Sequence, residues 1–464
     1  MKKTKKYITY GFLFVFGLLA LSTLNSCRKL INENPSGTKI LSSDVYTDSV
    51  TVQATLAGMY TTLIYSNAYN FYLAALPAFT ADELNYVGNT YTQYINNTIA
   101  TNDPNNESIW SSSYNIIYTT NSIISGVNSS SGISSRFKNQ ALGEALFVRA
   151  FCYFELTNLY GDVPLILGTD VGSNSTVART PSTAVYSQII SDLNLAQRYL
   201  PADYSASGGT ARTRANKFAA TALLARVYLY QSDWVNAEAQ ATTVINSSLY
   251  SLTTDLTTVF TPASQEAIFQ FYNQPDGYTQ WAYNVIPNPI TPVPTYVLTT
   301  QQVAAFTPGD KRQTTWTATI LYNKVSYSYP YKYKNITTAA NAEYYTVLRI
   351  AEQYLIRAEA RAEQGNTSGA ITDLNSIHNP TRVNLPIYSG ATDKASVLSA
   401  IMKERQVELF AEWGHRWFDL KRTNTANTVL GAEKPTTWKP TAVLYPIPST
   451  EITNNPKLVQ NPGY

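Results

Sequence analysis

The stretch ERQVELFAEWGHRWFDLKR, residues 404–422, gathers side chains that could carry acid–base chemistry. It places His415, one of only two histidines in the chain, between Glu412 and Asp419. A catalytic imidazole needs an orienting partner and a nucleophile within hydrogen-bond reach. The chain contains no Gly-x-Ser-x-Gly, His-Glu-x-x-His or Cys-x-x-Cys motif that would complete such a set. The sequence therefore gives His415 no recognisable catalytic companion.

Helical spacing gives the same stretch a simpler interpretation. Its large apolar residues follow one another at intervals of three or four, which predicts one stripe along a continuous helix. These residues are Phe410, Trp413, Trp417 and Leu420. His415 would project from the opposite side of that helix. Because aromatic residues at this spacing usually pack in a core, we expect the stretch to be a structural element.

Composition argues against several other classes of protein. Charged residues make up 14% of the 464 residues, and the formal net charge is +3. Four lysines lie within the first six residues, and removing them would leave a net charge of −1. No basic patch or phosphate-binding glycine loop is present, so we expect no nucleic-acid partner. No motif indicates a metal ion or a cofactor.

The N-terminus predicts export and lipidation. KKTKK precedes an apolar run from Tyr10 to Leu24, which is typical of a signal peptide over residues 1–26. The run ends at L-N-S-C, which is similar to the lipoprotein cleavage box and makes Cys27 the predicted acylation site. Ordinary secretory cleavage is the alternative, but Cys152 lies in an apolar helical run and offers no disulfide partner. Acyl chains on Cys27 would anchor the mature chain to a membrane without crossing it.

Two N-terminal segments predict amphipathic helices. Residues 44–65 open on Asp44, a plausible N-cap. Residues 108–127 form the second segment, and one face of it carries Trp110, Tyr114, Ile117 and Asn121.

Two later segments repeat each other at an offset of 133 residues. LLARVYLYQSDWVNAEAQATTVI (223–245) superposes on LIRAEARAEQGNTSGAITDLNSI (355–377). The matched pairs are Ala225 with Ala358, Gln231 with Gln364, and Ala237 with Ala370. Small residues at these places allow two antiparallel helices to approach closely, which resembles the tetratricopeptide unit. Residues 137–159 and 181–199 predict a third unit, although an unrelated helical bundle remains the alternative.

The chain between these repeats changes character. Residues 248–346 contain the proline-rich IPNPITPVPTY and the alternating SYSYPYKYK, whose tyrosines from Tyr327 to Tyr333 predict one face of a strand. We therefore divide the mature chain into an N-terminal helical repeat region (27–247), an irregular loop-rich lobe with short strands (248–346) and a C-terminal helical region (347–464). Long structured insertions commonly carry binding surfaces.

Several segments together resemble the SusD-like (RagB/SusD) family of nutrient-binding outer-membrane lipoproteins. EALFVRAFCYFELTNLYGDVPLI (144–166), TVLRIAEQYLIRAEARAEQGN (346–366) and the stretch at 404–422 are similar to its three signatures. LINENPSG after Cys27 and the closing LYPIPSTEITNNPKLVQNPGY are similar to its ends. The chain departs from the family in having no acidic run after Cys27.

This resemblance implies a mainly α fold with tetratricopeptide-like repeats and a binding protein without catalysis. It implies a lipid-anchored protein of the outer membrane, exposed at the cell surface, that binds a glycan and works with a SusC-like TonB-dependent transporter. It also implies that residues 404–422 are structural and that their charges pair within the fold.

Two regions predict the ligand site, because aromatic rings cover sugar faces while amides bond sugar hydroxyls. The loop at 82–97 contributes Tyr86, Asn89, Tyr91 and Tyr94. The lobe contributes Trp281, Tyr283, Tyr296, Trp316 and Tyr322. For each ring the alternative is packing within its own region.

Other functions remain open at this stage. A relative of the same fold could capture peptides, and a concave helical surface could serve as a protein-interaction scaffold. A surface glycosidase would need paired carboxylates across a cleft, and the loops show no such pair. The sequence does not identify the glycan, because stacking rings recognise a face that many sugars share.

Overall fold

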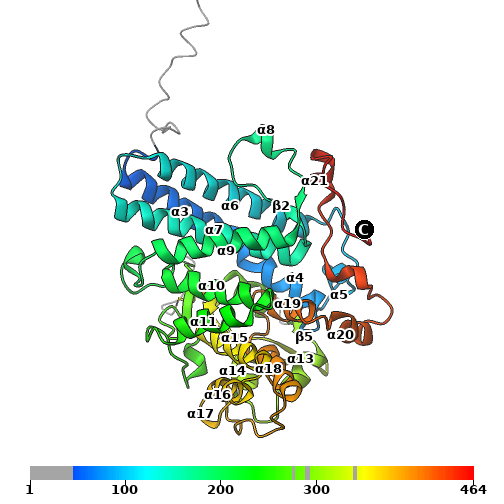
Figure 1. Cartoon of the computed structure of the whole chain (residues 1–464). Helices are drawn as coiled ribbons and strands as arrows, with labels where there is room; N and C mark the ends of the chain where they lie inside the picture. The colour runs from blue at the N-terminus through cyan, green and yellow to red at the C-terminus, as the bar shows by residue number, and fades with distance from the viewer. Residues whose placement is uncertain (1–44, 274–276, 288–292, 338–341) are drawn as a thin grey trace, which may run out of the picture.

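The computed structural model describes residues 45–273, 277–287, 293–337 and 342–464. The predicted signal peptide, Cys27 and Asp44 lie outside the described residues. Helices predominate, and within these described ranges the strands form four antiparallel pairs (Figure 1). The mainly α, tetratricopeptide-like fold predicted from the sequence is confirmed.

The long helices stack in chain order, each against the next. The N-terminal part of the stack contains α3 (Ser49–Tyr65), α6 (Pro104–Ser129), α7 (Ser135–Tyr160) and α9 (Ser182–Tyr199). The stack continues through α10 (Lys217–Tyr230), α11 (Trp234–Ile245), α15 (Ile350–Glu363), α16 (Thr367–Ile377) and α18 (Lys394–Glu408). Because α11 packs directly on α15, the segment between them is an insertion at the side of a continuous helical stack (Figure 1).

The helix pairs confirm the predicted repeats. The offset of 133 residues carries the bounds of α10 onto those of α15, and the start of α11 onto that of α16. Ala225 and Ala358, like Ala237 and Ala370, are fully buried, so the matched small residues lie where paired helices meet. The third predicted unit is α7 with α9, which pack together.

Carboxylate caps begin the first helices. Asp48 accepts hydrogen bonds from the backbone N–H groups of Val50 and Thr51 and caps α3, so the predicted start at Asp44 was four residues too early. Asp103 caps α6 through the N–H of Asn106, and α6 therefore begins before the predicted segment. The predicted inner face of α6 is confirmed, since Trp110, Ile117 and Asn121 are buried and Tyr114 packs against the core.

The inserted lobe contains the longer strands. β4 (Ala267–Phe271) pairs with β8 (Tyr345–Arg349), and β6 (Thr317–Tyr322) pairs with β7 (Val325–Pro330). Its helices are α12 (Gln280–Val285), α13 (Thr300–Ala305) and α14 (Lys311–Trp316), with the short 3-10 turn η4 (Leu256–Thr258). β7 ends at Pro330, so the predicted tyrosine strand is shorter than the alternation indicated.

The shorter elements connect this framework. Near the N-terminal helices lie η2, a π-helix (Ala68–Tyr72), α4 (Leu73–Thr80), α5 (Thr92–Ile95), α8 (Val171–Asn174) and η3 (Ser205–Ser207). Two short strand pairs join β1 (Leu84–Tyr86) to β5 (Tyr296–Leu298) and β2 (Val163–Pro164) to β3 (Arg179–Thr180). The C-terminal part adds α17 (Pro380–Val383), α19 (His415–Arg422), α20 (Ala426–Glu433), η5 (Pro440–Val443) and α21 (Ser449–Asn454).

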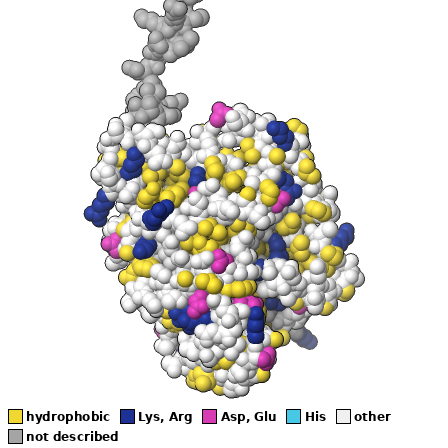
Figure 2. Space-filling model, viewed as in Figure 1, with side chains coloured by type: hydrophobic (Ala, Val, Ile, Leu, Met, Phe, Trp, Pro, Cys, Tyr) yellow, Lys and Arg dark blue, Asp and Glu magenta, His cyan; other side chains and the backbone are white. Residues whose placement is uncertain are grey.

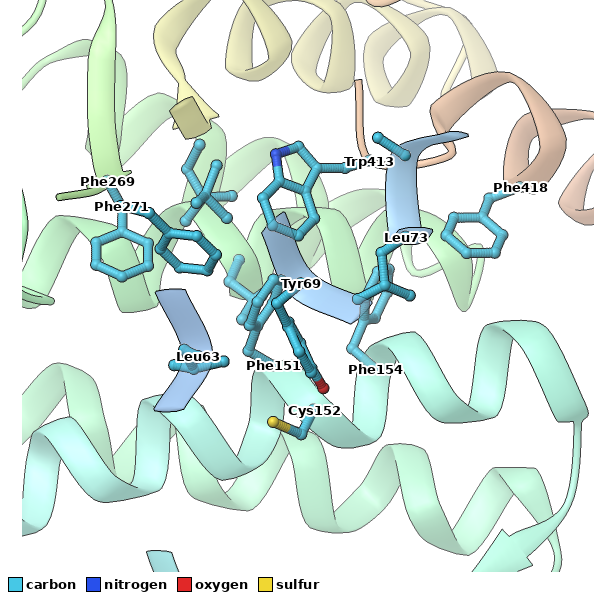
Figure 3. Close-up of a cluster of buried hydrophobic side chains, with 14 of the residues drawn as sticks. Leu63, Tyr69, Leu73, Phe151, Cys152, Phe154, Phe269, Phe271, Trp413 and Phe418 are labelled. Carbon is cyan, nitrogen blue, oxygen red and sulfur yellow. The ribbon is translucent and has the colours of Figure 1, made fainter. Parts of the chain in front are cut away.

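The core is centred on α7. Phe151 and Phe154 of α7 meet side chains from η2, β4 and the stretch at 404–422, and the buried Cys152 lies among them (Figure 3). The rings of Phe151 and Trp413 are 5.5 Å apart, so the stretch at 404–422 packs directly on α7. None of the described helices is both long enough and apolar enough to cross a bilayer.

The stretch at 404–422 is core, as predicted, but it is not one helix. Helix α18 ends at Glu408 and α19 begins at His415. Between them Ala411, Trp413 and Gly414 adopt positive φ values of 56°, 45° and 67°, which a helix cannot contain. At Gly414 a Cβ would lie 2.9 Å from Pro77, so the close approach of α4 also requires glycine.

All four residues of the predicted stripe are nevertheless buried, because the reversal folds both halves against the same core. They are Phe410, Trp413, Trp417 and Leu420. His415 does not face outward as predicted; it is 4% exposed, and burial lowers its pKa well below the usual range.

The charges of α18 enter a buried ionic cluster, here called the charge network. Its cations are Arg312, Lys332, Arg349 and Arg382, and its carboxylates are Glu266, Asp310, Glu404, Glu408 and Glu412. Guanidinium nitrogens of Arg312, Arg349 and Arg382 lie 2.8, 2.6 and 2.7 Å from the carboxylate of Glu408. This pairing within the fold is the structural role that the family resemblance implied.

Candidate ligand-binding site

A short strand pair brings the two predicted ligand-binding regions together. β1, at the start of the loop 82–97, pairs with β5 of the lobe, and Tyr86 lies opposite Tyr296. Opposed residues of an antiparallel pair hold their side chains side by side on one face. This pairing therefore joins aromatic residues that are more than two hundred positions apart in the chain.

Three tyrosines form a compact group, here called the tyrosine cluster: Tyr86, Tyr91 and Tyr296. The ring of Tyr86 lies 5.0 Å from that of Tyr91 and 5.2 Å from that of Tyr296, in both cases edge to face. Phe79 of α4 lies beneath them, stacked on Tyr91 at 5.0 Å and on Tyr296 at 5.8 Å. Edge-to-face and offset stacked contacts are the favourable geometries for aromatic pairs, so the cluster is held rigidly.

The cluster also carries polar atoms. The hydroxyl of Tyr296 donates to that of Tyr91 at 3.2 Å. Burial raises the pKa of Tyr91 and of Tyr296 above the ordinary phenol value, so both hydroxyls are neutral at physiological pH. A neutral phenol can donate or accept a hydrogen bond, as a sugar hydroxyl requires.

The exposed rim of the cluster comes from the turn after β1. Tyr86 is half-buried, while Asn85 and Asn89 are exposed. Gly88 has a φ of 141°, and a Cβ there would lie 3.0 Å from the Tyr86 ring, so glycine lets the turn pack against that ring. The amides therefore lie at solvent beside a fixed aromatic edge.

Tyr72, at the end of η2, is a residue that the sequence reasoning missed. Its side chain is half-buried, and its pKa is raised by burial and by the neighbouring Tyr91. It reaches the cluster through Phe71, whose ring is 5.3 Å from that of Tyr296. The only sequence signal for Tyr72 as a site residue is that it is aromatic and lies shortly before the loop 82–97.

Helix α12 contributes one buried and one exposed aromatic residue. Trp281 packs inward against Phe71 at 5.6 Å, whereas Tyr283 is 55% exposed. The ring of Tyr283 stacks on Tyr278 at 5.5 Å with an interplanar angle of 22°. Trp281 and Tyr283 are half a helical turn apart, so one ring points into the core and the other lies at the surface.

Burial corrects the prediction most completely at three positions. Tyr94, Trp281 and Trp316 are 0%, 1% and 0% exposed, so none of these rings can offer a face to a ligand in this conformation. The Tyr94 hydroxyl donates to Asp103, the residue that caps α6. Large aromatic rings contribute most to the stability of a fold when they are fully buried. These three residues therefore support the fold and do not form the site.

Trp316 and Tyr322 also lie apart from the cluster. Trp316 donates from its indole nitrogen to the carbonyl of Leu256 at 3.0 Å and lies beneath Lys332 of the charge network, 4.9 Å from its ammonium group. Tyr322 is 41% exposed at the end of β6, beside the hairpin turn at Asn323. Tyr91 and Tyr296 are also buried, at 8% and 6% exposed, and form the base of the cluster. Tyr86, Asn89 and Tyr283 are the predicted site residues that remain half-buried or exposed.

The predicted site offers aromatic rings, phenol hydroxyls and amide side chains. Among the described residues, no group of three His, Cys, Asp or Glu side chains is arranged to hold a metal ion. The one cysteine in those ranges, Cys152, is buried, and burial raises its pKa to about 12. On the face seen in Figure 2, charged side chains are scattered and form no large patch of one sign.

Comparison with known proteins identifies the family of the chain. A family model described as "Starch-binding associating with outer membrane" matches residues 38–229, and a model of the SusD family matches residues 292–464. The chain belongs to the SusD-like family. Two Formosa agariphila relatives cover nearly the whole chain: SusD-like protein P2 is 27% identical over 96% of this chain and 98% of its own. SusD-like protein P38 is 25% identical over 100% of both chains.

Solved structures show the same fold. A putative sugar-binding protein from Bacteroides vulgatus has a TM-score of 0.75 at 26% identity, over 90% of this SusD-like chain and 99% of its own. A laminarin-binding SusD-like protein has a TM-score of 0.75 at 23% identity, over 90% of this chain and 100% of its own. The second likeness concerns the fold alone.

Proposed function

We propose that this SusD-like protein is a cell-surface lipoprotein that binds oligosaccharide or polysaccharide and passes it to a TonB-dependent outer-membrane transporter. The observation that carries the proposal is the tyrosine cluster, which the β1–β5 pairing assembles next to exposed amides. Membership of the family and the sugar-binding description of one structural relative, at 26% identity, support it.

The geometry suits a sugar chain better than a catalytic reaction. The half-buried ring of Tyr86 and the stacked pair of Tyr278 and Tyr283 offer aromatic surface for the C–H faces of sugar rings. Asn85 and Asn89 supply amide groups for hydroxyls. Because a flexible glycan loses conformational freedom on binding, we expect a dissociation constant in the micromolar range or weaker, about −8 kcal/mol or less favourable.

Attachment to the outer membrane would come from Cys27. We expect Cys27→Ser to give a folded protein that no longer fractionates with membranes, because the acylated side chain is lost. Mass spectrometry of the wild-type chain should find a lipid on Cys27. An unmodified Cys27, or cleavage at another position, would contradict the anchoring proposal while leaving glycan binding untouched.

The decisive test is glycan binding by the double variant Tyr86→Ala/Tyr283→Ala. Calorimetry against a panel of plant, host and microbial polysaccharides first identifies a ligand of the wild type. The double variant should then lose at least about tenfold in affinity, because each stacked ring contributes on the order of 1 kcal/mol.

Tyr322→Ala is the matched control, because it removes an exposed tyrosine from the β6–β7 hairpin, outside the tyrosine cluster. It should bind like the wild type. Equal loss in the control would move the site to the hairpin, and unchanged binding by the double variant would overturn the site. If peptides bind the wild type and no glycan does, the carbohydrate ligand itself is wrong.

A further inference from the structure

A second cavity lies beside α6. It has a volume of about 350 Å³, within the range of pockets that hold small molecules. Its walls come from α6, from the chain around β2 and α8, and from α21 and the residues after it, which lie near one another in Figure 1. None of its lining residues belongs to the tyrosine cluster. We call this cavity the α6 pocket.

Aromatic side chains form one wall of the α6 pocket. Trp110, Tyr114 and Tyr118 follow at intervals of four along α6, so they line one side of the helix. The rings of Trp110 and Tyr114 are 5.1 Å apart, and the Tyr114 hydroxyl donates to the carbonyl of Pro164 at 2.9 Å. Tyr118 is 45% exposed. Ile166, Val171 and Leu458 complete an apolar lining.

One carboxylate, Glu451 of α21, lies in this apolar lining. Burial raises the pKa of Glu451, a hydrogen bond from Trp110 partly offsets that effect, and nearby Glu107 raises the pKa further. The described lining contains no Lys, Arg or His to balance its charge. The pocket is therefore electronegative on two counts, since aromatic faces also attract cations.

Two amides of the lining already donate hydrogen bonds within the protein. Asn174 donates to the carbonyl of Gly168 at 3.1 Å, and Asn455 donates to that of Val177 at 2.8 Å. The nearest guanidinium to influence Tyr114 belongs to Arg179.

Among the described residues Arg179 forms no ion pair with Glu451, although its positive charge acts on Tyr114. Its nitrogens donate to the carbonyls of Asp162 and Val459, both at 2.7 Å, and to Oδ1 of Asn461 at 2.6 Å. Because those acceptors hold the guanidinium, the carboxylate of Glu451 is left to attract a positive group from solution.

We propose that the α6 pocket binds an organic cation, an ammonium group carried on an apolar body. The carboxylate of Glu451 would pair with the ammonium, the Tyr114 and Tyr118 rings would contribute cation–π attraction, and the aliphatic wall would cover the apolar body. A neutral sugar suits the pocket less well, because Trp110 is only 2% exposed and the amides of Asn174 and Asn455 already donate within the protein.

The test compares benzylammonium with benzyl alcohol, a neutral probe of nearly the same size and shape, by calorimetry on the full-length protein. The wild type should bind the cation at least about tenfold more tightly, the effect of roughly one desolvated ion pair and one cation–π contact. Glu451→Gln should abolish that preference. Tyr118→Ala should weaken both probes, because part of the aromatic wall is lost.

Glu433→Gln is the matched control, since Glu433 is also a half-buried carboxylate but lies on α20, outside the pocket. It should keep the wild-type preference. Equal binding of the two probes, absence of binding to the folded wild type, or full preference in Glu451→Gln would each overturn the proposal. Cation binding by the wild type should also increase as the pH rises through the raised pKa of Glu451, and this rise should be absent in Glu451→Gln.

Discussion

The charge network and the tyrosine cluster both join the inserted lobe to the rest of the chain, but they treat polar atoms differently. Around Glu408 three guanidinium groups converge on one carboxylate that is 0% exposed. Around Tyr86 the polar atoms of Asn85 and Asn89 remain at solvent. The carboxylate of Glu408 has its hydrogen-bonding capacity occupied by protein, whereas the exposed amides have capacity left for a ligand.

This difference shows how the same fold uses polar residues in two ways. Burial alone would raise the pKa of Glu408, but Arg382, Arg349 and Arg312 reverse that effect and hold it well below the usual range. A buried charge with good partners belongs to the scaffold, because removing one partner leaves the others uncompensated. Exposed amides beside a rigid ring lose nothing when they exchange water for a hydroxyl.

The largest effect should come from breaking the charge network. Glu408→Gln removes the carboxylate shared by three arginines and should lower the free energy of unfolding by about 3–5 kcal/mol, as loss of one partner from a buried ion pair does. Urea denaturation at neutral pH measures this change.

Glu363→Gln is the surface control for that experiment. Glu363 pairs with Lys394 at 2.6 Å, but the lysine side chain is 48% exposed, so the loss should be at most about 1 kcal/mol. Comparable losses of unfolding free energy in the two variants would show that burial of the charge network does not increase its contribution to stability.

An apolar disruption of the same region should have a similar or slightly smaller effect. Trp417 is 0% exposed in α19, and Trp417→Ala should lower the free energy of unfolding by roughly 3–5 kcal/mol through lost burial and the cavity left behind. Denaturant unfolding followed by circular dichroism measures it. A loss below about 1 kcal/mol would mean that the core around α19 collapses to fill the space.

In a buried carboxylate without such partners, the pKa should shift in the direction opposite to that of Glu408. Burial raises the pKa of Glu155 to about 8, against an ordinary value of 4.5. The folded chain therefore keeps a proton that the unfolded chain releases, so the stability present below pH 4.5 is lost as the pH rises towards about 8. Glu155→Gln resembles the protonated form and does not titrate.

Relative to the wild type, Glu155→Gln should consequently gain stability between pH 5 and pH 9, on the order of 2–4 kcal/mol. Urea midpoints of both proteins at the two pH values measure the difference. Parallel pH profiles would show that Glu155 ionises normally in the folded protein.

The smallest effect on binding should come from His415, the residue that first looked catalytic. It is buried in α19, away from the tyrosine cluster, so His415→Ala should bind the cognate glycan within about twofold of the wild type, a free-energy change of about 0.4 kcal/mol. Calorimetry on the folded variant is the measurement. A folded variant that had lost binding would assign His415 a role in the site.

Much of the scaffold could be predicted from local pattern. The 133-residue offset located α10, α11, α15 and α16, because a helix has its own 3.6-residue period and buries matched small residues wherever two helices meet. The break between α18 and α19 could not be found in this way. The apolar spacing of residues 410–420 fits one helix equally well. Only the tertiary structure shows the positive φ values at Ala411, Trp413 and Gly414 and the close approach of Pro77 to Gly414.

The ligand site depended on tertiary structure to a greater degree. Sequence determined that tyrosines and amides gather in the loop 82–97 and that aromatic residues recur in the lobe. Which of them are exposed was decided by the β1–β5 pairing and by the orientation of α12, which bury Trp281 and leave Tyr283 at the surface. The same aromatic residue can pack in a core or bind a ligand, so its type does not distinguish the two roles. Only the contacts made by distant segments determine whether a ring is buried or left exposed for a ligand.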